Sequence, residues 1–177
     1  MGCDIHSFAE RKANNKWEKV KDFFSLDGWE KEYYKKEKTD SPFYWRGYSM
    51  FAFLADVRNY DCCEPISEPR GLPDDVCAEI EEEHEDWGID AHSCSYLTLK
   101  ELLDFDYEKV SWNRRISRTT YNKNGGSFTN GAALAEEGEG TNVTYRENLG
   151  EFFFTHLKEL QELGSPDDVR IVFWFDN

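Results

Sequence analysis

The chain opens with Met1-Gly2-Cys3-Asp4-Ile5-His6-Ser7-Phe8-Ala9-Glu10. In a β-strand, successive side chains point to opposite faces. The even positions then hold two carboxylates, an imidazole and an aromatic ring: Asp4, His6, Phe8 and Glu10. The odd positions hold small or apolar side chains: Cys3, Ile5, Ser7 and Ala9. Because a strand normally buries its apolar side, the sequence predicts that the even face carries a binding site.

The end of the chain predicts the neighbour of this strand. Residues 169–175 are densely β-branched and aromatic, which is typical of a central strand, and we expect them beside the first strand. The first strand continues into a hairpin over 3–12 and 16–22, because Asn14-Asn15 tolerates the positive φ of a tight turn.

Helical spacing of apolar residues predicts helices around 48–58, after Pro73, over 98–106 and over 147–163. Thr98 and Glu101 have the spacing of a capping box at the start of the third of these. The segment 25–42 is charged and aromatic by turns, and we interpret it as a surface connection. We expect an α+β fold with a mixed or antiparallel sheet, formed by the N-terminal hairpin and the C-terminal strand, and with helices packed on one face.

Size and charge limit the function. A chain of 177 residues, 16% of them aromatic, suits one domain over 1–177. The net charge of -15 argues against direct nucleic-acid binding and against an anionic membrane surface, and leaves a basic protein partner open. The five cysteines form no Cys-x-x-Cys pair, and neither a signal peptide nor a membrane-spanning apolar run is visible. We therefore expect a reducing, cytoplasmic setting.

A repeated triplet is the sharpest chemical signal: Asp4-Ile5-His6 and Asp90-Ala91-His92. If the two triplets met, they would offer two nitrogen and two oxygen ligands, a set that suits Zn²⁺, Mn²⁺ or Fe²⁺. Glu10 would then orient a ligand or act as general base. The alternatives are a structural role for both triplets, or a polar pocket without a metal. Cys94, beside His92, is a further candidate ligand.

A basic stretch interrupts the acidic sequence, since residues 109–135 contain no Asp or Glu. Arg114, Arg115 and Arg118 would hold a phosphate opposite the metal, or grip a nucleotide together with Trp112 and Tyr121. Internal pairing with the acidic surface is the alternative. That surface is predicted on the second helix, as a solvated face or a partner-binding face: Glu79, Glu81, Glu82, Glu83, Glu85 and Asp86.

Several segments carry a resemblance that spans most of the chain: 1–6, 51–59, 65–76, 90–93 with Ser95, 97–99, and 168–177. In them the chain resembles a family of uncharacterised proteins from tailed bacteriophages and prophages. The resemblance implies a phage or prophage origin and action inside the bacterial host, and it brings no activity with it. This chain has Cys94 where the family pattern often has His, so a family ligand at that position would be a thiolate here or would be lost.

Two hypotheses follow. The first is a divalent-metal-dependent hydrolase that acts on a phosphoester or nucleotide, with Asp4, His6, Asp90 and His92 as ligands. The second is a non-catalytic counter-defence protein that sequesters a nucleotide signal or binds a host protein through its acidic surface.

Overall fold

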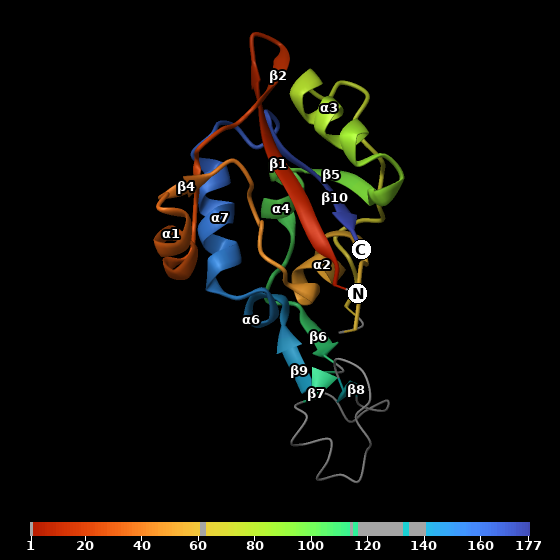
Figure 1. Cartoon of the computed structure of the whole chain (residues 1–177). Helices are drawn as coiled ribbons and strands as arrows, with labels where there is room; N and C mark the ends of the chain where they lie inside the picture. The colour runs from red at the N-terminus through yellow and green to blue at the C-terminus, as the bar shows by residue number, and fades with distance from the viewer. Residues whose placement is uncertain (1, 61–62, 114, 117–132, 135–140) are drawn as a thin grey trace. The chain divides into compact units, whose positions relative to one another are not determined.

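The computed structural model describes residues 2–60, 63–113, 115–116, 133–134 and 141–177 (Figure 1). The chain divides into two compact units. The first comprises Met1–Arg46, Pro69–Phe105 and Glu151–Asn177, and the second comprises Gly47–Glu68 and Asp106–Gly150. The single domain over 1–177 stays a prediction.

The first unit is built on a four-stranded antiparallel sheet in the order β2-β1-β10-β5. Its strands are β1 (Asp4–Ala13), β2 (Lys16–Lys19), β5 (His92–Thr98) and β10 (Val169–Asp176). The C-terminal strand lies beside the first strand, as predicted, and is buried along nearly its whole length, because β1 and β5 flank it and other elements pack on both of its faces. The predicted α+β class with an antiparallel sheet is confirmed.

The turn between β1 and β2 is also as predicted. Asn14 and Asn15 have φ values of 51° and 61°, the left-handed conformation that a two-residue hairpin turn requires. The hairpin's second strand ends at Lys19 rather than at residue 22.

The segment predicted as a surface connection contains regular structure. The short strands β3 (Phe24–Ser25) and β4 (Lys38–Thr39) pair antiparallel around the helix α1 (Gly28–Tyr34). The Asp27 carboxylate caps the helix by accepting a hydrogen bond from the Glu30 amide at 2.7 Å. Lys35 ends it in a left-handed conformation, with φ 55°.

Helices cover both faces of the sheet, where one covered face was expected (Figure 1). On the even face, Ile80 of α3 (Ala78–Trp87) packs in a buried cluster with Phe8, Val172 and Trp174. A short 3₁₀ turn, η1 (Gly88–Asp90), follows α3. The second helix had been expected from Pro73 and begins at Ala78.

Two helices, α4 (Leu99–Asp104) and α7 (Glu151–Gln161), cover the odd face together with the segment that contains Pro42 and Phe43. Ser7 donates a hydrogen bond to the Pro42 carbonyl, and the next residue, Phe43, stacks on Phe153 of α7 at 4.5 Å. The capping box predicted at Thr98 and Glu101 is present at the start of α4. The helix predicted over 147–163 is two helices, because Gly150, at φ 77°, separates α7 from α6 (Tyr145–Leu149).

The second unit contains α2 (Tyr48–Ala55), α6, and two antiparallel pairs of strands. β6 (Val110–Asn113) pairs with β9 (Thr141–Thr144), and β7 (Arg115–Ile116) pairs with β8 (Ala133–Leu134). The Tyr145 hydroxyl donates to the Glu64 carbonyl at 2.9 Å, while its ring meets the Phe53 ring edge-on at 5.8 Å. In the described part of the chain, every helix lacks the combination of length and apolar character needed to cross a lipid bilayer.

Candidate functional site

The carboxylate that pairs with His6 is Asp176. His6 Nε2 lies 3.1 Å from Asp176 Oδ2, because Asp176 stands opposite Asp4 in the β1–β10 register. The His6 ring lies 4.1 Å from the Trp87 ring and 6.0 Å from the Trp174 ring, measured between centroids. Asp4 and His6 had been expected to share a strand face as metal ligands, whereas the carboxylate in contact with His6 belongs to a residue 170 positions away in the sequence.

Asp4 is held by a different partner. Its two carboxylate oxygens accept from Arg46 Nε at 2.7 Å and Arg46 Nη2 at 2.5 Å, a bidentate pair. The hydrogen bond from Arg46 lowers the pKa of Asp4. Asp4 is thus engaged in an ion pair at the surface of the sheet's first strand.

Glu10 is fully buried and has a partner on each oxygen. Oε2 accepts from Arg170 Nε at 2.5 Å, and Oε1 accepts from the Cys77 amide at 2.7 Å. Arg170 also donates to Asp75 at 2.7 Å and lies 4.0 Å above the Trp17 ring. These contacts are those of a structural ion pair, and they leave no surface of Glu10 for the proposed general-base role.

The second triplet lies elsewhere on the sheet. Asp90 ends the turn η1 and is exposed. His92 begins β5 opposite Phe175, on the odd face, and its Nδ1 lies 3.1 Å from Ser93 Oγ. Ser93 has φ 50° and lies at a break in the β5–β10 register, which is a β-bulge.

The structure therefore does not bring the two triplets together. Among the described residues, no group of three or more His, Cys, Asp or Glu side chains is placed to hold a metal ion. The shared site of Asp4, His6, Asp90 and His92 is not assembled, and a bound divalent metal stays a prediction.

Cys94 is partly buried on the even face. It packs against the cluster of Phe8, Ile80, Val172 and Trp174. Burial raises the pKa of its thiol to about 11. A protonated thiol in such surroundings is a packing residue.

The arginines of the basic stretch fall where little is described. Arg114 and Arg118 lie outside the described residues. For Arg115 only the backbone is described, in β7 opposite Leu134. Their phosphate-binding role stays a prediction.

The carboxylates of the acidic helix α3 fall into two sets, one paired with lysines and one exposed. Glu79 forms an ion pair with Lys21 at 2.6 Å, and Glu83 forms one with Lys19. The other four carboxylates are exposed: Glu81, Glu82, Glu85 and Asp86. The exposure of these four carboxylates is compatible with a solvated face and with a face that binds a basic partner. Binding of such a partner stays a prediction.

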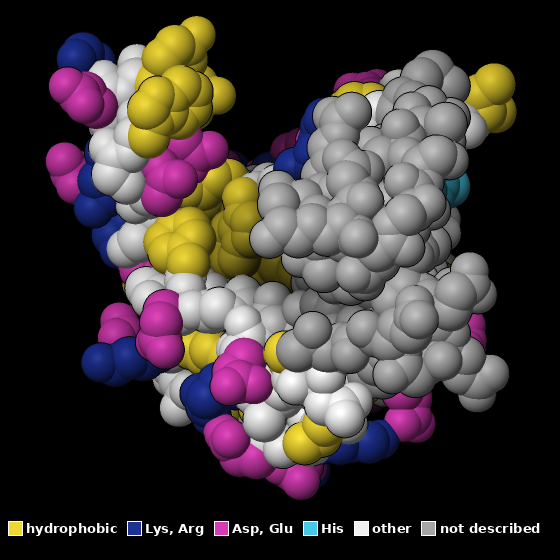
Figure 2. Space-filling model, turned by 90° about the horizontal axis from the view of Figure 1, so that it is seen from below, with side chains coloured by type: hydrophobic (Ala, Val, Ile, Leu, Met, Phe, Trp, Pro, Cys, Tyr) yellow, Lys and Arg dark blue, Asp and Glu magenta, His cyan; other side chains and the backbone are white. Residues whose placement is uncertain are grey.

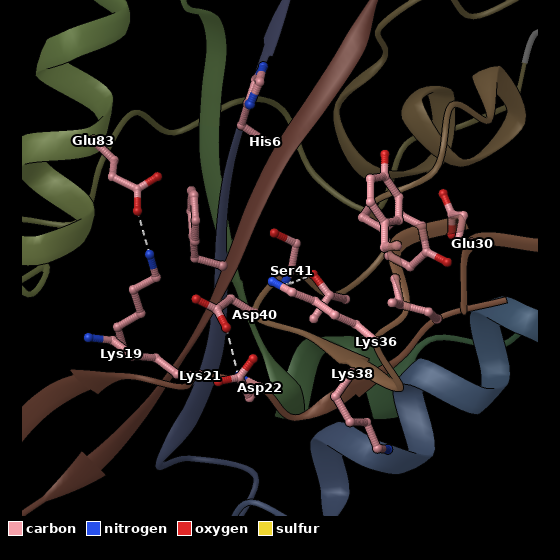
Figure 3. A pocket seen from close by; sticks show the side chains of 15 residues that line it. His6, Lys19, Lys21, Asp22, Glu30, Lys36, Lys38, Asp40, Ser41 and Glu83 are labelled. Atoms are coloured by element: carbon pink, nitrogen blue, oxygen red, sulfur yellow. Dashed lines mark hydrogen bonds and ion pairs between the residues drawn. The ribbon is translucent and has the colours of Figure 1, made fainter. Parts of the chain in front are cut away.

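A pocket of about 820 Å³ is present in the first unit, near the start of the chain (Figure 3). It lies among β1, β2, the segment from residue 21 to residue 44, and α3. Four lysines line it: Lys19, Lys21, Lys36 and Lys38. So do four carboxylates: Asp22, Glu30, Asp40 and Glu83. His6, Thr39, Ser41, Tyr34 and Tyr44 are also in the lining.

Carboxylates hold three of the lysines in place. The Lys19 ammonium lies 4.3 Å from the Phe8 ring and pairs with Glu83. The Glu79 carboxylate raises the pKa of Lys21, so Lys21 stays charged. Lys38 donates to Glu159 at 2.8 Å. Lys36 is exposed and forms no ion pair with any residue that the structure describes.

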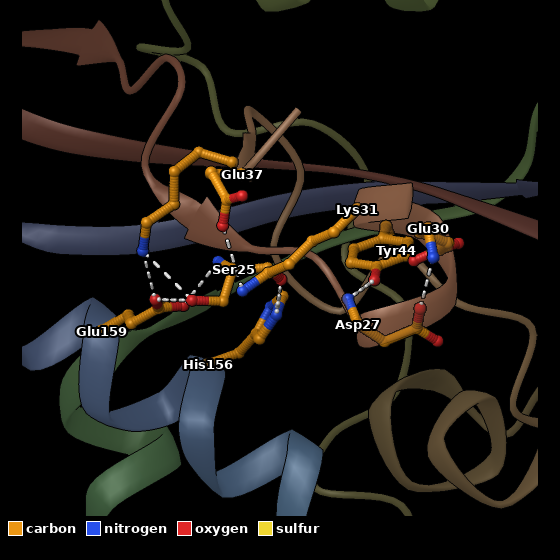
Figure 4. A network of polar contacts seen from close by, with 9 residues as sticks. Ser25, Asp27, Glu30, Lys31, Glu37, Tyr44, His156 and Glu159 are labelled. Atoms are coloured by element: carbon orange, nitrogen blue, oxygen red, sulfur yellow. Dashed lines mark hydrogen bonds and ion pairs between the residues drawn. The ribbon is translucent and has the colours of Figure 1, made fainter. Parts of the chain in front are cut away.

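A polar network on the α7 side fixes the wall that carries Lys38 (Figure 4). Glu159 accepts from the Ser25 amide at 3.0 Å and from Ser25 Oγ at 2.6 Å. Burial opposes ionisation of Glu159, but the hydrogen bonds from Lys38 and Ser25 outweigh it and lower the pKa of Glu159. Lys38 is therefore anchored by a carboxylate that stays ionised.

His156 is buried in the same network. Its Nδ1 accepts from the Phe43 amide at 3.0 Å, so its Nε2 carries the proton and donates to the Ser25 carbonyl at 2.8 Å. Burial lowers the pKa of His156. Nearby, the Tyr44 hydroxyl accepts from the Asp27 amide at 2.9 Å, and burial raises its pKa above the usual range. These bonds fix the loop that carries Tyr44 into the pocket.

The pocket can hold a polar ligand with both anionic and hydrogen-bonding groups. Lysine ammonium groups bind phosphates as point charges, carboxylates accept from hydroxyl and amino groups, and tyrosine rings stack on flat rings. The sequence had indicated His6 but not the lysines, because the Lys-Glu alternation of 30–38 is equally typical of a solvated surface. Comparisons of the chain with protein-family models, curated proteins and solved structures gave no match.

Proposed function

We propose that the protein is a non-catalytic binding protein that sequesters a nucleotide in the pocket of its first unit. The observation that carries the proposal is the gathering of Lys19, Lys21, Lys36 and Lys38 around one pocket, in a chain whose net charge is -15. Four lysines thus converge on one volume.

The chemistry of the lining fits the parts of a nucleotide. Lys36 and Lys38 are suited to the phosphate. Asp22, Asp40 and Glu30 are suited to ribose hydroxyls and base amino groups. Tyr34 and Tyr44 offer rings for the base. The volume, about 820 Å³, lies within the usual range for small-molecule sites.

The anchoring carboxylates favour a site that is ready for its ligand. Glu79 and Glu159 hold Lys21 and Lys38 from outside the lining. A phosphate can therefore approach these ammonium groups without displacing a carboxylate from the pocket. A binding site whose cations are held before the ligand arrives loses less side-chain entropy on binding.

The proposal includes a setting taken from the resemblance to phage proteins. There the protein would act in the cytoplasm of a bacterial host and remove a nucleotide signal that serves host defence.

A second candidate function, hydrolysis of a phosphoester in the same pocket, is favoured by one observation. His6 lines the pocket and has a carboxylate partner in Asp176, an arrangement that orients an imidazole as a general base. The two candidates differ in outcome, since only hydrolysis converts the bound nucleotide to product.

The test is calorimetric titration of the full chain with AMP, ADP, inorganic phosphate and adenosine. We expect AMP and ADP to bind and adenosine to bind more weakly. Lys36→Glu is expected to lower AMP affinity by about tenfold or more, because it replaces a charge-assisted contact with repulsion. Lys158→Glu, at an exposed lysine of α7 outside the pocket, is the control and should leave the affinity unchanged.

Absence of binding by all four compounds, or equal losses in both variants, would contradict the proposal. Conversion of ADP would favour the second candidate.

A further inference from the structure

Helix α1 carries large aromatic side chains that the core does not use. None of its residues is buried. Trp29, Tyr33 and Tyr34 are 67%, 66% and 56% exposed. Figure 2 shows a projecting group of hydrophobic side chains, with charged ones around it, on the left of the view, the side where Figure 1 draws α1. Aromatic side chains gathered on a surface mark a place where something binds.

The rings of Trp29, Tyr33 and Tyr34 contact one another in a row, which we call the aromatic ladder. Trp29 stacks on Tyr33 with centroids 5.1 Å apart and planes 13° apart. Tyr33 meets Tyr34 edge-on at 4.9 Å and 89°. Tyr34 lines the pocket, and the other two rings do not. On α1 the pocket is thus lined by Tyr34 and Glu30, and the rings of Tyr33 and Trp29 continue the row outside the lining.

We propose that the ligand of the pocket is a dinucleotide, with one nucleotide in the pocket and the base of the other stacked on the Trp29–Tyr33 pair. This inference rests on the proposed function. An exposed, flat aromatic surface is the platform on which single-stranded bases stack, and every base has a face suited to it. The exposed faces of Trp29 and Tyr33 serve this purpose without any rearrangement of the core.

Lys36 is placed for the phosphate that links the two nucleotides. It follows Tyr34 by two residues, lines the pocket, and has no ion pair among the described residues. Because Lys36 lines the pocket and follows the aromatic helix in the sequence, its ammonium group is available to the phosphate that links the two nucleotides.

The charge of the chain limits the length of the ligand. Each added nucleotide brings another phosphate into the field of a protein of net charge -15. Two bases are sufficient to occupy both the pocket and the ladder.

The experiment compares AMP, linear pApA and pApApA by calorimetric titration of the full chain. We expect pApA to bind about tenfold tighter than AMP, the usual gain from one stacked base, and pApApA to bind no tighter than pApA. Trp29→Ala and Tyr33→Ala should remove the advantage of pApA and leave AMP affinity unchanged. Trp29→Phe should retain part of it. Ile89→Ala, at a fully exposed apolar residue of η1, is the matched control and should retain all of it.

The outcomes separate the two proposals. Equal affinities for AMP and pApA overturn the dinucleotide and leave nucleotide binding intact, whereas failure of both to bind overturns nucleotide binding itself. If Trp29→Ala instead abolishes a concentration-dependent dimer in sedimentation and pApA shows no advantage, the ladder is a contact between copies of the chain. The variants alter exposed side chains, so circular dichroism should match the wild type and exclude misfolding as the cause.

Discussion

His6 and His92 lie on opposite faces of the same antiparallel sheet. His6 stands opposite Trp174, and His92 stands opposite Phe175, the next residue along β10. Without a bulge, His92 would share the face of Cys94, which is the face of Phe8 and His6. The extra residue at Ser93 reverses the alternation and turns the second imidazole away from the first. The separation of the two triplets thus comes from a single residue.

Ser93→Gly is expected to stabilise the protein. Ser93 has φ 50°, a conformation that costs a non-glycine residue about 1 kcal/mol and costs glycine almost nothing. Relief of this strain is partly offset by the greater freedom that glycine gives the unfolded chain, so the free energy of unfolding, measured by urea denaturation, should rise by about 0.5 kcal/mol. Ser93→Ala removes the hydroxyl and keeps the strained conformation, so it should not stabilise. A glycine variant no more stable than the alanine variant would contradict the bulge.

The bulge shows what spacing could and could not predict. Local signals were sufficient for the Asn14-Asn15 turn and for the Thr98 capping box, because both depend on residues near one another in the chain. The pairing of the terminal strand with the first was also predictable, since few other segments are apolar enough to be central. The partner of His6 was not, because Asp176 reaches it only through the β1–β10 register.

The pocket was missed for a related reason. Lys19, Lys21, Lys36 and Lys38 come from two segments that were interpreted as a hairpin strand and a surface connection. Their convergence depends on the short β3–β4 pair, which brings residues 24 and 39 together. A pair of two-residue strands is too short to give a periodic pattern of apolar residues in the sequence. Glu10 was likewise interpreted as a candidate general base, because the sequence alone does not show that Arg170 stands opposite it in the β1–β10 pair.

Glu10→Gln should be among the most destabilising single substitutions in the chain. It removes the buried carboxylate of the pair and leaves the exposed Asp75 as the remaining carboxylate partner of Arg170, and breaking a buried pair costs up to about 3 to 5 kcal/mol. Asp4→Asn breaks the Arg46 pair at half-exposed side chains and should cost about 1 kcal/mol or less. Urea denaturation of both variants checks the difference. A Glu10→Gln variant as stable as the wild type would return Glu10 to the candidates for catalysis.

His156 should make the protein less stable in mild acid. Its folded-state pKa is lowered by burial, so the unfolded chain binds a proton more readily than the folded one. The stability that the neutral imidazole contributes is present above its unfolded pKa of about 6.5 and is lost as the pH falls below that value. Urea denaturation between about pH 7 and pH 5 should show this decline. The pKa of Glu159 is also lowered, but its contribution is lost only below the ordinary carboxyl pKa, so the two effects occur in separate ranges. An NMR titration that finds the pKa of His156 above 6.5 would contradict the buried, neutral ring.

Cys94 should resist alkylation in the folded protein. Burial raises its pKa to about 11, so at about pH 8 only about one thiol in a thousand is a thiolate, the form that reacts. Treatment with iodoacetamide followed by peptide mass spectrometry should find Cys94 unmodified, and the same treatment in urea should modify it. Its partial burial against the Phe8–Trp174 cluster supplies the physical reason, because this apolar packing disfavours the charged thiolate. Rapid alkylation of Cys94 in the native chain would mean that this part of the even face is open, and would restore the thiol as a candidate metal ligand.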